Sequence, residues 1–144
     1  MNFMKVLFIL VTIISCFCMA CHEQTVGFLV TENASYDPDS LVIRKIPDPE
    51  EDRVRIEYNA PWISTDLQGY EGTAQIQFDV ESVSSSLGEE AARVFQEELS
   101  IRGGGYLMYP LKNNAKPGRY VVSVRLSNPG YSQVIKDAFT FIVE

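Results

Sequence analysis

Strict alternation of apolar and polar residues is the feature that most limits how this chain can fold. It runs without a break over residues 74–80 and recurs over residues 120–126 and, more briefly, over residues 54–58. Because successive side chains of a strand point to opposite faces, this pattern predicts half-buried β-strands. The inward positions of the 120–126 strand would be Tyr120, Val122, Val124 and Leu126.

Shorter apolar runs add further candidate strands, over residues 26–30, 41–46, 99–102, 106–110 and 138–143. Turn sequences separate them. Three glycines at 103–105 predict a hairpin tip, and Asn128-Pro129-Gly130 predicts the connection into the last strand. About eight short strands with regular turn signals predict an antiparallel β-sandwich.

One segment departs from the period of two. Ser86 and Glu89 have the spacing of a capping box, with Ser86 as the N-cap. The apolar residues that follow recur at helical spacing, with charged residues mostly opposite. We therefore expect one short helix over about residues 88–98, packed across one end of the sandwich.

The C-terminal third carries a family resemblance. Pro117-Gly118-Arg119-Tyr120, the valines that follow it, and the stretch up to Val143 resemble the closing strands of immunoglobulin-like and cadherin-like extracellular modules. The resemblance implies an immunoglobulin-like sandwich over residues 26–144. The acidic calcium motifs of cadherins are missing from the sequence, so metal-dependent adhesion is not implied.

The N-terminus has the layout of a secretory signal. Lys5 precedes an apolar run, and no charged residue occurs between Lys5 and His22. The stretch of about 16 residues is shorter than the ~20 that span a bilayer comfortably. We expect a signal peptide over residues 1–20, with a retained membrane anchor as the alternative.

The cysteines refine this expectation. The end of the apolar run resembles a bacterial lipobox, in which the acylated cysteine becomes the new N-terminus. Cys21 follows Ala20 and precedes polar sequence, which makes it the preferred lipidation site; Cys16, after Ile13-Ile14-Ser15, is the alternative. The lipid would hold the protein at a membrane. A tether over residues 21–25 spans at most ~17 Å and keeps the domain close to that membrane.

The whole chain also resembles small lipoproteins of Bacteroides-type bacteria, many of which accompany polysaccharide uptake. This resemblance implies an exported protein that is anchored in the cell envelope, at the outer membrane. The formal charge is −7, and removal of Lys5 with the signal leaves 11 bases against 19 acids, or −8. Such an acidic chain is not expected to bind nucleic acid.

The sequence offers few groups for catalysis. His22, the single histidine, stands beside the anchor, where no preorganised site can form. We expect no enzyme activity, no catalytic residue, no cofactor and no dedicated metal site. The acidic residues between 48 and 52 lie in a turn stiffened by prolines, and whether they bind a calcium ion is left open.

Aromatic residues are the better candidates for ligand binding, because sugar rings stack on aromatic side chains. Trp62 either plugs the core or contacts a ligand. Tyr70, Tyr106, Tyr109 and Tyr131 lie in or beside turns, where two of them could form a platform or simply cap the core.

Two functions are consistent with these features. The first is a non-enzymatic, lipid-anchored binding module of the cell envelope, serving a glycan or an envelope protein, with polysaccharide binding or uptake as one role. The second is a structural subunit that contributes an edge strand to a larger protein assembly.

Overall fold

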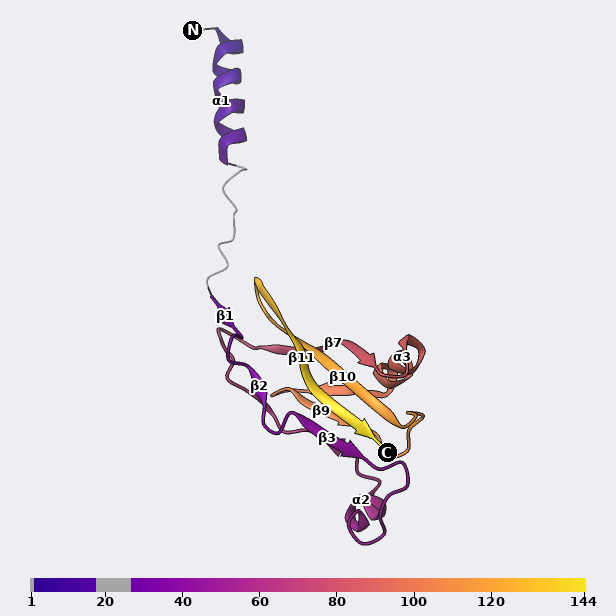
Figure 1. Cartoon of the computed structure of the whole chain (residues 1–144). Helices are drawn as coiled ribbons and strands as arrows, with labels where there is room; N and C mark the ends of the chain where they lie inside the picture. The colour runs from indigo at the N-terminus through magenta and orange to yellow at the C-terminus, as the bar shows by residue number, and fades with distance from the viewer. Residues whose placement is uncertain (1, 18–26) are drawn as a thin grey trace.

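The computed structural model describes residues 2–17 and 27–144, and the domain is mostly β, as the alternation predicts (Figure 1). The elements are α1 (Phe3–Phe17), β1 (Leu29–Val30), β2 (Ser35–Tyr36), β3 (Ser40–Ile43), α2 (Arg53–Tyr58), β4 (Trp62–Ile63), β5 (Leu67–Gln68), β6 (Glu71–Gly72), β7 (Gln77–Ser85), α3 (Glu89–Glu98), β8 (Ser100–Arg102), β9 (Tyr106–Tyr109), β10 (Gly118–Asn128) and β11 (Tyr131–Val143). Within the described residues, no helix combines the length and the apolar character needed to cross a membrane.

The largest sheet has the strand order β3-β11-β10-β7. β10 and β11 form a long antiparallel hairpin whose last pair is Asn128 with Tyr131. Two residues, Pro129 and Gly130, therefore make the turn, and Gly130 adopts a φ of 89° that favours glycine. The predicted connection into the last strand is confirmed.

The outer strand β3 runs parallel to β11, with Ser40 opposite Thr140 and Ile43 opposite Val143. The prediction of a purely antiparallel sandwich is wrong at this edge. Alternation along a strand shows which side chains face the core, but it carries no information about the direction of the neighbouring strand.

A smaller sheet has the order β4-β9-β8, and two further pairs, β1 with β6 and β2 with β5, contain two residues a side. β8 and β9 are antiparallel and end with Arg102 opposite Tyr106. The glycines at 103–105 form the tip of this hairpin, as predicted.

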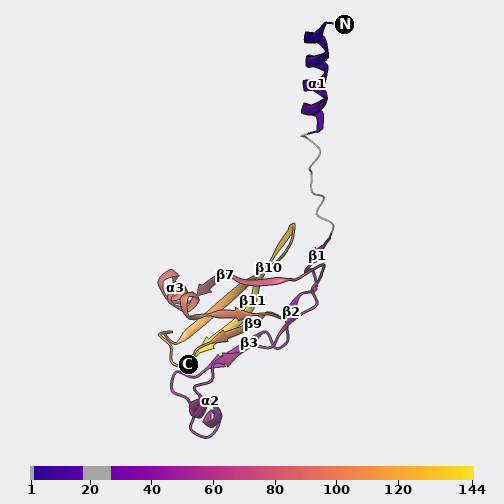
Figure 2. The same ribbon diagram turned by 180° about the vertical axis from the view of Figure 1, so that it is seen from behind.

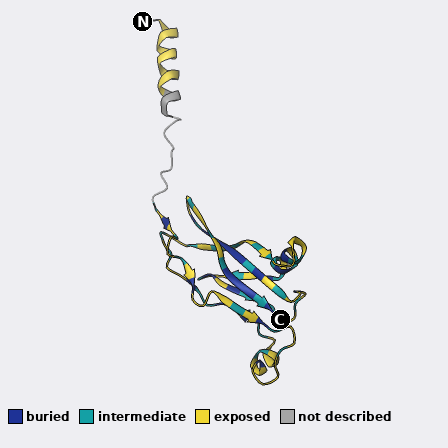
Figure 3. Ribbon diagram, viewed as in Figure 1, coloured by how far each residue is buried: buried dark blue, intermediate teal, exposed yellow. Residues whose placement is uncertain are grey.

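The core lies where the two larger sheets meet, and the buried residues in Figure 3 concentrate on the central strands. All four predicted inward positions of β10 (Tyr120, Val122, Val124 and Leu126) have no exposed surface. They pack in one cluster with Leu107 and Tyr109 of β9, Phe139 and Phe141 of β11, and Ile43 of β3. Burying each large apolar side chain contributes about 1.5–3 kcal/mol, so this cluster is the main source of stability.

Helix α3 connects β7 to β8 and agrees closely with the helix predicted over residues 88–98. Its Phe95 is fully buried between two tyrosines, with ring centroids 4.1 Å from Tyr109 and 4.2 Å from Tyr120, both stacked. The predicted capping box is wrong, because Gly88 is the N-cap. Ser86 instead accepts a hydrogen bond from the backbone N–H of Arg119 at 3.1 Å and so joins the helix entry to β10.

Helix α2 occupies residues 54–58, so the strand that alternation predicted there is wrong. The expectation of a single helix in the domain is wrong for the same reason. The loop before it is already wound. The Asp48 carboxylate accepts hydrogen bonds from the N–H groups of Glu50 and Glu51, and the N–H of Asp52 donates to the Asp48 carbonyl. Asn59, at a φ of 48°, ends the helix in the left-handed region. Five residues of alternation are too few to override these local turn signals.

Candidate functional site

The proposed lipidation site cannot be placed in the structure. Cys21 and the 21–25 tether lie outside the described residues, while Cys16 falls within α1. The description of the domain begins at Gly27, just before β1.

The start of the domain is fastened to the tip region of the β10–β11 hairpin. The side-chain amide of the buried Asn128 donates to the carbonyls of Phe28 and Thr73, both at 2.8 Å. The Thr73 hydroxyl in turn accepts from the N–H of Phe28 at 3.1 Å. Because one side-chain amide donates to two backbone carbonyls, these hydrogen bonds fix the position at which the chain enters the domain.

Two of the five aromatic candidates are core residues. Trp62 is 3% exposed and Tyr109 is fully buried. The hydroxyl of Tyr109 donates to the Glu98 carboxylate at 3.0 Å. Burial, and next the negative charge of Glu98, raise the pKa of Tyr109 far above its usual value. Neither ring offers a face to a ligand in this structure.

The other three tyrosines are separate from one another. Tyr106 is 40% exposed at the start of β9, and Tyr131, half-buried, begins β11. Tyr70 packs edge-on against Phe78, with ring centroids 5.4 Å apart. Among the described residues, no ring pair joins two of the five candidates, so no aromatic platform forms.

A buried carboxylate organises the acidic loop that the sequence left open as a calcium site. Asp52 is 1% exposed and accepts two hydrogen bonds from the Arg44 guanidinium, at 2.8 and 2.9 Å. It also accepts from Arg55 at 3.0 Å and from the N–H of Asp48 at 2.8 Å. These donors, the Arg44 hydrogen bonds foremost, lower the pKa of Asp52 to about 2. Both oxygens are engaged by protein donors.

The same cluster attaches α2 to the body of the domain. The Cζ atom of Arg55 lies 3.9 Å from the centroid of the Trp62 ring, and that of Arg44 lies 5.8 Å from it. A planar guanidinium over an indole face is a favourable cation–π arrangement. Trp62 is therefore covered by charged side chains from the segment 44–55 rather than by solvent.

Helix α2 consequently carries its apolar residues outward. No residue of α2 is buried; Val54 is 60% and Tyr58 71% exposed, and four residues apart they share one face. Ile46, in the preceding loop, is 87% exposed. An ordinary surface helix turns its apolar stripe to the core. We refer to residues 44–59 as the α2 segment.

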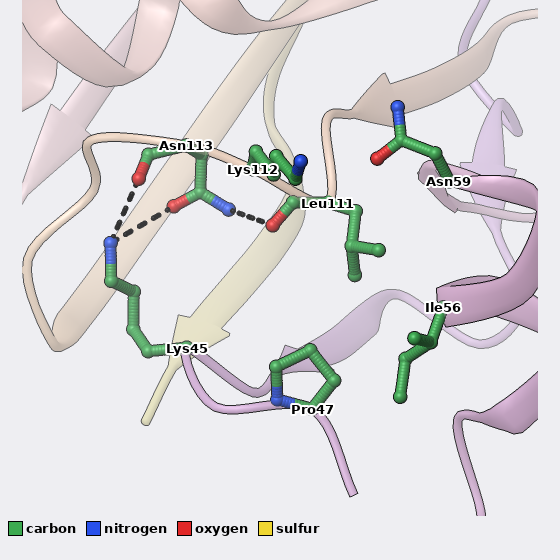
Figure 4. Close-up of a pocket in the computed structure, with 7 residues that line it drawn as sticks. All are labelled: Lys45, Pro47, Ile56, Asn59, Leu111, Lys112 and Asn113. Atoms are coloured by element: carbon green, nitrogen blue, oxygen red, sulfur yellow. Dashed lines mark hydrogen bonds between the residues drawn. The ribbon is translucent and has the colours of Figure 1, made fainter. Parts of the chain in front are cut away.

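A groove of about 630 Å³ lies between the α2 segment and the loop after β9 (Figure 4). Pro47, Ile56 and Leu111 give it apolar walls, and Lys45, Asn59, Lys112 and Asn113 complete its lining. Lys45 donates to the Asn113 carbonyl at 2.9 Å, and the Asn113 amide donates to the Pro110 carbonyl at 2.9 Å. The lysine thus joins the two walls. We call this the α2 groove.

Sequence reasoning missed both the charged cluster and the α2 groove. Comparison with known proteins adds no candidate, since no family model, curated protein or solved structure matches the chain.

Proposed function

We propose that this protein is an exported, lipid-anchored binding module of the bacterial cell envelope, built on an immunoglobulin-like sandwich and without enzyme activity, that holds a protein partner at the outer membrane. The lipid on Cys21 attaches it to the membrane. The α2 segment meets the partner. Nucleic acid is not among its ligands.

The strand order supports the immunoglobulin-like assignment. When the two-residue strands β5 and β6 are left out, the strand orders β4-β9-β8 and β7-β10-β11 correspond to the B-E-D and C-F-G orders of immunoglobulin domains. The hydroxyl of Tyr120, near the start of β10, donates to the Lys116 carbonyl at 2.7 Å. This contact corresponds to the tyrosine corner at the start of strand F in such domains.

One observation carries the functional proposal: the chain enters the domain at one end and the α2 segment lies at the other. β1 and α2 occupy opposite ends of the domain in both Figure 1 and Figure 2. A domain tethered through its N-terminus presents the far end away from the bilayer. That end carries the exposed Ile46, Val54 and Tyr58. Exposed apolar side chains gathered in one place are typical of protein interaction sites.

The arrangement of the aromatic side chains favours a protein over a glycan as the partner. Sugar binding relies on exposed ring faces, and Trp62 and Tyr109 are buried. Affinity electrophoresis of the protein against a panel of polysaccharides checks this choice. We expect that no polysaccharide changes the migration of the protein. If a polysaccharide retards the protein and Tyr106→Ala abolishes this retardation, the partner is a glycan and not a protein.

Photo-crosslinking in the native bacterium tests the proposed function. A photoreactive amino acid replaces Tyr58 in the full chain, and a matched variant carries it at Val134, which is 41% exposed on β11. We expect one discrete protein adduct from position 58 and none from position 134. Absence of any protein adduct from position 58 would contradict the proposal.

The structural-subunit alternative rests on β7. This strand of nine residues pairs with β10 and forms one edge of the largest sheet within the described part of the chain. Such an edge can add a strand from another protein. An added strand pairs through backbone hydrogen bonds, which a side-chain crosslinker does not report. Backbone hydrogen exchange of residues 77–85, compared between the purified protein and membranes, is therefore the better measure. Protection that appears only in membranes would favour this alternative.

A further inference from the structure

We propose that the α2 groove binds a segment of the partner protein in which apolar side chains alternate with aspartate or glutamate. This inference rests on the proposed function and specifies the chemistry of the same end of the domain. The apolar walls at Pro47, Ile56 and Leu111 supply the hydrophobic contact, and Lys45 and Lys112 supply the charge.

The charge of the groove is opposite to that of the protein. The chain has 19 acidic and 12 basic residues, yet the seven lining residues include two lysines and no acid. Neither lysine forms an ion pair with a carboxylate in the described residues. Lys45 uses hydrogen bonds to the carbonyl and the side-chain oxygen of Asn113, at 2.9 and 3.4 Å, which leaves one of its three donors. An acidic ligand in the groove therefore meets two lysines and no carboxylate among the lining residues, which favours its binding there.

The walls of the groove require an apolar component as well. Ile56 is 45% exposed, and Figure 4 shows it beside Pro47 and Leu111 around the same open space. Arg55, the residue before Ile56, is held over the ring of Trp62. This contact fixes the position of helix α2, and with it the backbone of Ile56, against the domain. A groove that is already formed loses little conformational entropy on binding. Asn59 adds an amide group that can hydrogen-bond the backbone of an extended segment.

The binding experiment uses the full lipidated chain in detergent and fluorescent hexapeptides. The probe alternates aspartate with leucine; one control peptide alternates lysine with leucine and another alternates aspartate with serine. We expect saturable binding of the aspartate–leucine peptide and at least tenfold weaker binding of both controls. Equal binding of the three peptides would overturn the inference, as would equally tight binding of an acidic polysaccharide or of anionic vesicles.

Charge reversal provides the matched variants. Lys112→Glu alters the groove, whereas Lys136→Glu makes the same change at an exposed position of β11. We expect Lys112→Glu to weaken peptide binding about tenfold, because it places like charges together, and Lys136→Glu to leave it unchanged. Equal thermal unfolding of the two variants excludes a folding defect, and equal loss of binding in both would contradict the groove assignment.

Combining these variants with the crosslink from position 58 separates the two proposals. Loss of the adduct in Lys112→Glu, with retention in Lys136→Glu, supports both. Retention of the adduct in both variants overturns the groove while the proposed function stands. Absence of the adduct in the otherwise unaltered chain overturns the proposed function itself, even if the acidic peptide binds.

Discussion

The guanidinium of Arg55 lies over the indole of Trp62, with Cζ 3.9 Å from the ring centroid. This contact joins a six-residue helix to the first strand of the smaller sheet. Asp52, 1% exposed, accepts a 3.0 Å hydrogen bond from the same guanidinium. Helix α2 is thus attached through charge and an aromatic face, and its apolar side chains remain exposed.

Replacing Arg55 should loosen α2. We expect Arg55→Ala to lower the free energy of unfolding by about 1–2 kcal/mol, because a cation–π contact and an ion pair are lost together. Arg55→Lys should be intermediate, since lysine keeps the charge but not the planar stacking. Urea unfolding followed by the emission of Trp62, the single tryptophan, measures the change. Arg53→Ala, at an exposed position of the same helix, is the control; an equal loss there would count against a specific role for Arg55.

Acid should destabilise the protein through Asp52. Its pKa is about 2 in the folded chain and 3.8 as the ordinary value. Because the pKa is lower in the folded chain, the ionised Asp52 stabilises the folded state at pH values above the ordinary pKa of 3.8. This contribution disappears as the pH falls from about 4 to about 2. Asp52→Asn should be less stable at pH 7 and should lose less on acidification through this window. Parallel pH profiles of the two proteins would show that Asp52 does not carry the effect.

The entry of the chain should depend on Asn128. In Asn128→Ala the carbonyls of Phe28 and Thr73 lose their shared donor, at a cost of about 1–3 kcal/mol. Hydrogen exchange should accelerate in residues 27–30 and 71–73 more than in the core strands. Ser127→Ala, at the preceding position of β10, is the control. Unchanged exchange in the first strand pair would mean that Asn128 does not fasten it.

The strands and the helix that the sequence predicts best are those with long periodic patterns. β10 alternates apolar with polar residues from Val122 to Leu126, and each predicted inward side chain is buried. Helix α3 has four apolar positions at helical spacing and is anchored by the buried Phe95. In both elements the local pattern and the packing of the core favour the same structure, so sequence reasoning succeeds.

Helix α2 shows where such reasoning stops. Its five alternating residues resemble a strand, and its helical form depends on the turn around Asp48 and on Asn59. Its outward apolar face follows from the attachment of Arg55 to Trp62, a tertiary contact. The α2 groove likewise joins Lys45 and Lys112 from distant parts of the chain. Spacing in the sequence contains no signal for either, because both arise only when the sheets have packed.

The proposed orientation of the α2 segment away from a membrane requires a lipid anchor at the N-terminus, so acylation of Cys21 is the most direct test. Cells are labelled with a palmitate analogue, and the mature protein is weighed intact. We expect label in the wild-type chain and in Cys16→Ala, no label in Cys21→Ala, and a mature mass that begins at an acylated Cys21. If the label is lost in Cys16→Ala but kept in Cys21→Ala, the anchor is Cys16. A wild-type chain without any acyl group would contradict membrane attachment by a lipid.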